Sequence, residues 1–136
     1  IYEGTSQLQI VAATGPLLGR VLDDLIADWS AEDYGTDLAP LKARLDEATG
    51  WLGAGVDRLS GADRTVVDYY AADLVDLAVH LLTCWLTLRQ ARFSPRKAEV
   101  ARVYVADTLP KMQAWSARLD ALDPAPIEGR GVVLAG

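Results

Sequence analysis

Cysteine and histidine are scarce in this chain. Among 136 residues there is one cysteine, Cys84, and one histidine, His80. A single cysteine cannot form an internal disulfide. A single histidine cannot supply the paired histidines of zincin or ferritin-like metal sites. We therefore expect no disulfide framework and no metal site, and we expect a reducing, cytoplasmic location.

Basic residues are also few relative to acidic ones. The chain has 13 Lys and Arg against 19 Asp and Glu, which gives a formal net charge of −6. Binding along a nucleic acid requires a basic surface that neutralises phosphates, and such a surface is lacking. The acidic balance also opposes attraction to anionic lipid, and no segment has the Lys- and Arg-rich polar face of an interfacial helix. We expect neither nucleic acid nor membrane as a partner.

Two hydrophobic patterns are missing as well. The most apolar run, Leu74 to Leu88, is fifteen residues long and contains Asp76 and His80, so by itself it is too short and too polar to span a bilayer. Strict alternation of apolar and polar residues, which is typical of strands, is nearly absent. With 51% hydrophobic residues the chain still has enough apolar surface for a globular core.

Apolar residues recur three and four positions apart, which predicts helices. We expect a helix from about Ser6 that is interrupted at Gly15 and Pro16. Four further helices are expected over about 17–29, 38–59, 62–93 and 95–122, the last one capped by Ser94. Three glycines, Gly50, Gly53 and Gly55, indicate either local fraying or a close approach of two helices. The predicted fold class is all-α, an antiparallel up-and-down bundle of about four main helices.

One polar stripe and one thiol on the predicted 62–93 helix are candidates for chemistry. The stripe consists of Asp73, Asp76, His80, Thr83 and Thr87, spaced by three and four residues and so on one helix face. It is either a solvated or interface surface or a site that uses the Asp76 and His80 pair. Cys84 falls on the apolar stripe with no basic neighbour in its turn, which indicates an unreactive core thiol.

The first nine residues, Ile1 to Gln9, have the sequence IYEGTSQLQ. This segment closely resembles the signature near the C-terminus of flavin-dependent acyl-CoA dehydrogenases. The resemblance implies that Glu3 is the base that removes the α-proton of an acyl thioester, with the Glu3 amide polarising the thioester carbonyl. It also implies that Tyr2 and Gly4 line the acyl-CoA pocket and that Thr5 and Gln7 contact FAD. The family usually has an arginine after the second glutamine, where this chain has Ile10.

A second, patterned resemblance covers residues 96–105 together with Leu109 and Pro110. It is similar to the helical extension that follows the catalytic core in longer members of the same family. The resemblance divides the chain into the end of a catalytic core (1–15), a helical extension bundle (16–123) and a loose tail (124–136). It further implies a homo-oligomer, an acyl-CoA substrate and an electron-transfer partner.

The chain opens with Ile1 and shows no signal-peptide pattern, so we expect a piece of a longer protein. On this interpretation it is the C-terminal part of an FAD-dependent acyl-CoA dehydrogenase. Alone it is expected to be inactive and structural or interface-forming, because the flavin cradle lies in the rest of that protein. The alternative is a free-standing helical module that binds a partner protein.

Overall fold

The computed structural model describes residues 2–129, including the side chains of residues 9, 10 and 12–129. Over this range the chain is helical and contains no strand. The helices are α1 (Tyr2–Leu18), α2 (Asp23–Ser30), α3 (Gly35–Ser60), α4 (Arg64–Ala91) and α5 (Pro95–Ala121). A short helical turn follows at 125–129. The predicted all-α bundle is confirmed.

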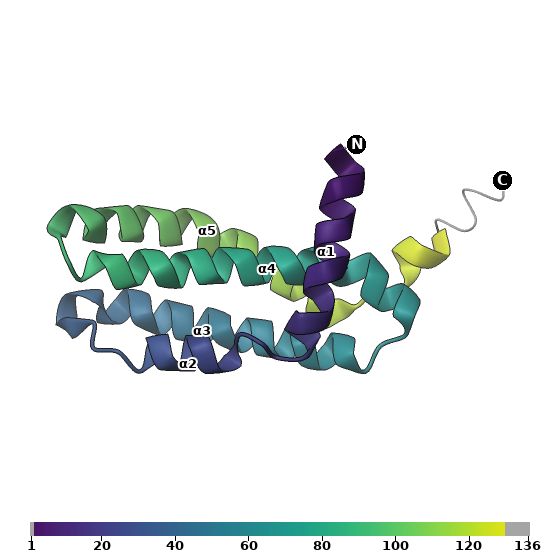
Figure 1. Cartoon of the computed structure of the whole chain (residues 1–136), viewed down its shortest axis with the longest axis horizontal. Helices are drawn as coiled ribbons and strands as arrows, with labels where there is room; N and C mark the ends of the chain where they lie inside the picture. Colours follow the sequence, from purple (N-terminus) through teal and green to yellow (C-terminus); the bar gives the residue numbers. More distant parts are fainter. Residues whose placement is uncertain (1, 130–136) are drawn as a thin grey trace.

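The three long helices α3, α4 and α5 form an up-and-down core in which each packs against the other two. Figure 1 shows α4 running between α3 and α5 along the long axis of the molecule. The apolar stripe of α4, which runs from Val67 to Leu88 at spacings of three and four and includes Cys84, faces this core, since every member except the half-buried Val67 is buried. Its buried members are Tyr70, Leu74, Leu77, Leu81, Cys84 and Leu88. Ser94 caps α5 as predicted, its hydroxyl accepting a hydrogen bond from the Lys97 amide at 3.1 Å.

Helices α1 and α2 pack against α3 and α4. The predicted interruption at Gly15 and Pro16 is wrong, because α1 continues to Leu18. Proline in the last turn removes only one amide donor, and the helix tolerates that loss. The break comes at Arg20, whose φ of 61° is left-handed. The amides of Arg20 and Val21 then bond the carbonyls of Leu17 and Pro16 at 3.0 and 3.2 Å, which is a Schellman motif.

Helix α4 is the one helix among residues 2–129 that is long and apolar enough to cross a membrane by length and composition. Its 28 residues include an 18-residue window with a mean hydropathy of 1.5. The helix extends well beyond the fifteen-residue run Leu74 to Leu88, so length alone does not exclude a span. Within the bundle 44% of this window is buried against neighbouring helices.

Candidate functional site

Residues 2–9 of the segment that resembles the dehydrogenase signature form the amino-terminal half of α1. Because α1 begins at Tyr2, Glu3 lies in the first helical turn, and the predicted start at Ser6 is wrong. A carboxylate in a first turn is favoured by the helix dipole. Figure 1 shows this half of α1 projecting away from the bundle. The side chains of residues 1–8 lie outside the described residues, so the roles assigned to Glu3, Tyr2, Gly4, Thr5 and Gln7 stay predictions.

The carboxy-terminal half of α1 is anchored on the bundle. Leu17 belongs to the buried core. Thr14 is also buried, and its hydroxyl donates a 2.7 Å hydrogen bond to the carbonyl oxygen of Ile10, one turn earlier. This bond occupies the one donor that the Thr14 side chain has. One helix thus joins the projecting signature segment to the packed bundle.

A groove of about 700 Å³ lies between this half of α1 and the corner at which α3 turns into α4. Its size is typical of sites for small molecules. The charged side chains at the groove, Arg64 and Asp68, are largely exposed and lie 3.6 Å apart. The apolar walls are formed by Ile10, Leu18, Leu59, Val67 and Ala71. Sequence patterns did not reveal this groove, because its walls come from three separate helices.

The polar stripe on α4 is divided among separate structural contacts. Asp73 pairs with Arg118 of α5 at 3.1 Å. The Nδ1 atom of His80 lies 2.8 Å from the backbone carbonyl of Asp76, so Nδ1 donates and carries the proton. The His80 ring also packs against Trp115, with 4.8 Å between ring centroids. His80 is therefore held by a backbone oxygen and an aromatic ring.

Asp76, the other member of the candidate pair, has a raised pKa because burial disfavours its charged form, while the nearby His80 acts in the opposite direction. Its carboxylate has no hydrogen-bond partner among the described side chains. Over the described part of the chain, no three His, Cys, Asp or Glu side chains come close enough together to hold a metal ion.

Cys84 is buried in the core, as predicted. Burial raises the pKa of its thiol to about 12, and a hydrogen bond with Thr108 offsets only part of that effect. The thiolate is the nucleophilic form of cysteine, and very little of it exists near neutral pH at such a pKa. The Cys84 thiol is therefore protonated at neutral pH in the folded chain.

A charged cluster that the sequence analysis missed joins the α2–α3 loop to the end of α4. The Glu32 carboxylate accepts hydrogen bonds from Nε and Nη2 of Arg89, both at 2.9 Å. Arg92 lies 3.0 Å from the same carboxylate. The Arg89 guanidinium also stacks on Trp29, 4.9 Å from the ring centroid. Because residues 32 and 89 are 57 positions apart, no local spacing pattern links them.

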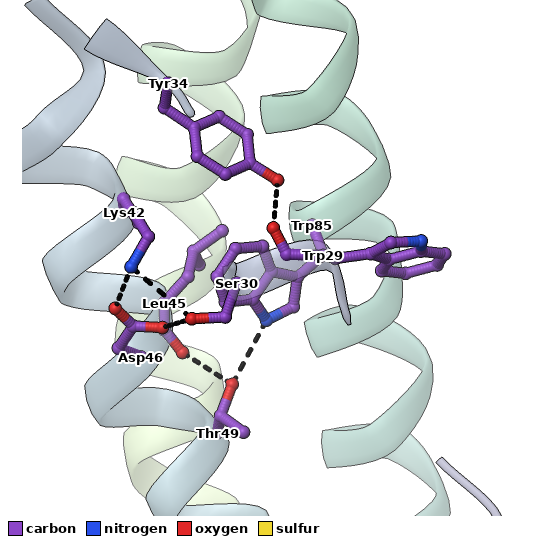
Figure 2. Close-up of polar contacts among 8 residues, drawn as sticks. All are labelled: Trp29, Ser30, Tyr34, Lys42, Leu45, Asp46, Thr49 and Trp85. Atoms are coloured by element: carbon purple, nitrogen blue, oxygen red, sulfur yellow. Dashed lines mark hydrogen bonds and ion pairs between the residues drawn. The ribbon is translucent and has the colours of Figure 1, made fainter. Parts of the chain in front are cut away.

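A second polar network, shown in Figure 2, ties α2 and α4 to α3. Ser30 donates to Asp46 at 2.6 Å, and Lys42 donates to the other oxygen of that carboxylate at 2.7 Å. Deeper in the core the indole of Trp85 donates to the Thr49 hydroxyl at 3.1 Å. Ser30 of α2 and Trp85 of α4 are thus each tied to a side chain of α3.

No protein-family description, no curated protein and no solved structure matches this chain. The structure itself offers two features of α1 as the candidate site. One is the projecting amino-terminal half, and the other is the groove along the carboxy-terminal half.

Proposed function

We propose that this chain is the C-terminal part of an FAD-dependent acyl-CoA dehydrogenase, which introduces an α,β double bond into an acyl-CoA thioester. The observation that supports it is the nine-residue segment Ile1 to Gln9, of which residues 2–9 form the amino end of a helix that projects from the bundle. A base acting on a substrate held by another domain has to lie outside the packed bundle. The projecting half of α1 has this arrangement.

In this proposal Glu3 takes the α-proton of the thioester, and the amide at Glu3 stabilises the charge that develops on the carbonyl oxygen. The β-hydride leaves for the flavin, which supplies the electron acceptor when bound. Thr5 and Gln7 would contribute to holding FAD, and Tyr2 and Gly4 to holding the acyl-CoA. The bundle formed by α3, α4 and α5 has a structural or interface role, in a homo-oligomeric cytoplasmic enzyme served by an electron-transfer partner.

The test uses the complete protein encoded by the gene, purified with its flavin. Anaerobic addition of acyl-CoA is expected to bleach the flavin absorbance in the unmodified protein. Glu3→Gln removes the base while keeping the side-chain size, so it should abolish bleaching and retain bound flavin. The control Glu47→Gln alters an exposed carboxylate on α3 and should leave bleaching unchanged. Retained bleaching in Glu3→Gln refutes Glu3 as the base, and an initiator codon directly before Ile1 refutes the assignment to a longer enzyme.

A free-standing helical interaction module is the second candidate, and exposed apolar side chains support it. Val79 and Leu86 on α4 are 52% and 44% exposed, and they are two turns apart on one face. Val100 and Val103 on α5 are likewise exposed. Sedimentation velocity of the 136-residue chain tests this candidate. A concentration-dependent dimer that Leu86→Glu dissociates supports it, and a monomer at all concentrations counts against self-association through this face.

A further inference from the structure

The turn between α4 and α5 presents an aromatic side chain to solvent. Phe93 is the one phenylalanine of the chain, and at 75% it is the most exposed large hydrophobic residue in the described range. The Arg92 guanidinium lies 5.5 Å from the centroid of its ring. Aromatic residues and arginine are enriched at the centres of protein–protein contacts. Residues 92–97, which we call the tip, therefore have the composition of a contact surface.

The tip is basic, although the whole chain has a formal net charge of −6. Residues 89–102 contain five Lys and Arg and one Glu. Residues 32–37 at the same end add three carboxylates, so five positive charges face four negative ones and leave a net charge of +1. Arg96 and Lys97 are exposed and form no ion pair with any described side chain. These two cations are available to a partner.

The apolar groove beside α1 lies at the other end of α4. The α4 residues that line it come from the first two turns, between Arg64 and Ala71, whereas Phe93 follows the last turn. Figure 1 shows the α3–α4 turn and the α4–α5 turn at opposite ends of the bundle. Asp68 at the groove and Ala91 at the end of α4 are 23 positions apart, which corresponds to about 35 Å along the helix. Phe93 therefore cannot enter the groove of its own chain.

The groove has the volume, chemistry and charge to receive the tip. Its volume of about 700 Å³ exceeds that of one aromatic ring, and its walls are largely apolar. The end of the molecule around it is acidic, since residues 57–73 contain four Asp and two Arg. Asp68 at the rim has a side chain that is 62% exposed. Opposite charges on the two ends favour an approach of one copy's tip to another copy's groove.

We propose that the chain associates head to tail with a second copy, in which the Phe93 ring of one copy enters the groove of the next and Arg96 and Lys97 face Asp68. This association involves neither Glu3 nor a flavin, so it goes beyond the proposed function. The two contact surfaces differ, so each added copy leaves one of them open and the assembly can lengthen. A single aromatic anchor buries much less than the roughly 1,200 Å² of a stable interface, so the Kd should be on the order of 0.1–1 mM.

The experiment records ¹H–¹⁵N correlation spectra of the 136-residue chain between about 0.05 and 1 mM, which brackets the expected Kd. The amides around Phe93 and those of the groove residues Val67 and Ala71 should shift together as the concentration rises. Added salt should reduce these shifts, because it screens exposed charges. Phe93→Ser should raise the Kd by about tenfold or more. The control Val103→Ser trims another exposed apolar side chain of α5 and should change the Kd less than about twofold.

A second pair of variants tests the groove. Asp68→Arg reverses the charge at the rim and should also raise the Kd about tenfold. Asp107→Arg makes the same change at an exposed carboxylate of α5, outside the groove, and should change the Kd less than about twofold. The decisive sample mixes ¹⁵N-labelled Phe93→Ser, which keeps its groove, with unlabelled Asp68→Arg, which keeps its tip. The shifts should be confined to groove amides, and with the labels exchanged they should be confined to the tip.

Two results overturn this association: the absence of concentration-dependent shifts, and groove shifts that persist when both chains in the mixture carry Phe93→Ser. Leu86→Glu should leave the shifts unchanged, and their loss in that variant would place the contact on the exposed face of α4 instead. The spectra show whether each variant is folded, and Ser60→Arg on the same groove wall replaces Asp68→Arg if the latter is not. Flavin bleaching by acyl-CoA tests the proposed function separately, so either proposal can fail alone.

Discussion

At the scale of single residues, the Glu32 carboxylate is held by two arginines, Arg89 and Arg92. Hydrogen bonding to Arg89 holds the pKa of this carboxyl below its usual value of 4.5, and the positive charge of Arg92 acts in the same direction. Arg89 lies in the last turn of α4 and Arg92 is its C-cap residue. The helix dipole favours cations at this end of a helix. The cluster joins the loop before α3 to the end of α4, so it fixes the geometry of one end of the bundle.

The first prediction concerns the pH dependence of this cluster. A group whose pKa is lowered by folding stabilises the fold above its unfolded pKa, and this contribution is lost as the pH falls through the folded pKa. Glu32→Gln should therefore lower the free energy of unfolding at pH 7. The difference from the unmodified chain should shrink progressively once the pH falls below 4.5. Urea denaturation at pH 7 and pH 3, followed by circular dichroism, measures both values.

Glu47→Gln is the matched control for this prediction. Glu47 is an exposed carboxylate on α3, and the same change there should have little effect at either pH. The free energy of unfolding of Glu32→Gln is compared with that of the unmodified chain. If their difference stays constant, or grows toward low pH, the ion-pair explanation is contradicted.

At the scale of helices, Gly55 lies where α3 packs tightly against side chains of α5 and α4. An added Cβ at this position would lie 3.0 Å from Cδ1 of Leu119 and 3.5 Å from Cδ1 of Leu74. Both leucines are fully buried, so neither has open space to move into. At Gly50, five residues earlier on the same helix and exposed to solvent, an added Cβ would meet nothing within 4 Å. The sequence indicated either fraying or close approach for these glycines, and at Gly55 the structure shows close approach.

The second prediction compares the two glycines directly. Replacing glycine by alanine inside a helix usually raises stability by about 1 kcal/mol. Gly50→Ala should show this gain. Gly55→Ala should lose it, because overpacking costs about 1–3 kcal/mol and leaves this variant no more stable than the unmodified chain. Thermal and urea unfolding of the two variants provides the measurement, and an equal gain at both positions would show that the core adapts around Leu119.

The helices also show which features local sequence can predict. The faces of α3 and α4 were predicted because the three-four spacing of leucines is contained within each helix. The end of α1 was not, because it depends on Arg20 adopting a left-handed conformation that usually favours glycine. The Glu32 cluster and the groove at Gly15 depend on contacts between distant segments, which no spacing within one helix encodes. The role of Glu3 rests on the resemblance of its segment alone and stays a prediction, because its side chain lies outside the described residues.

At the scale of the whole molecule, α4 holds the other helices together, and this position explains its composition. It packs against α5, α3, α1 and α2, so it needs apolar residues on more than one side. The same composition makes α4 resemble a membrane span. Moving α4 into a bilayer would uncover buried leucines on the neighbouring helices, each worth about 1.5–3 kcal/mol, and would carry Asp73, Asp76 and Arg89 with it.

The third prediction follows from this competition between core and bilayer. The folded chain should stay in the supernatant with phosphatidylcholine vesicles, because α4 is already covered by its neighbours. Trp85→Ala should co-sediment with vesicles to a greater extent, since deleting a fully buried tryptophan costs about 3–5 kcal/mol and frees α4 part of the time. Leu86→Ala is the control, because it trims an exposed apolar side chain of α4 and leaves the core intact. If the unmodified chain pelleted with vesicles and Leu86→Ala reduced that fraction, α4 would be a membrane-binding helix, because only a helix that contacts lipid through its exposed face responds to that change.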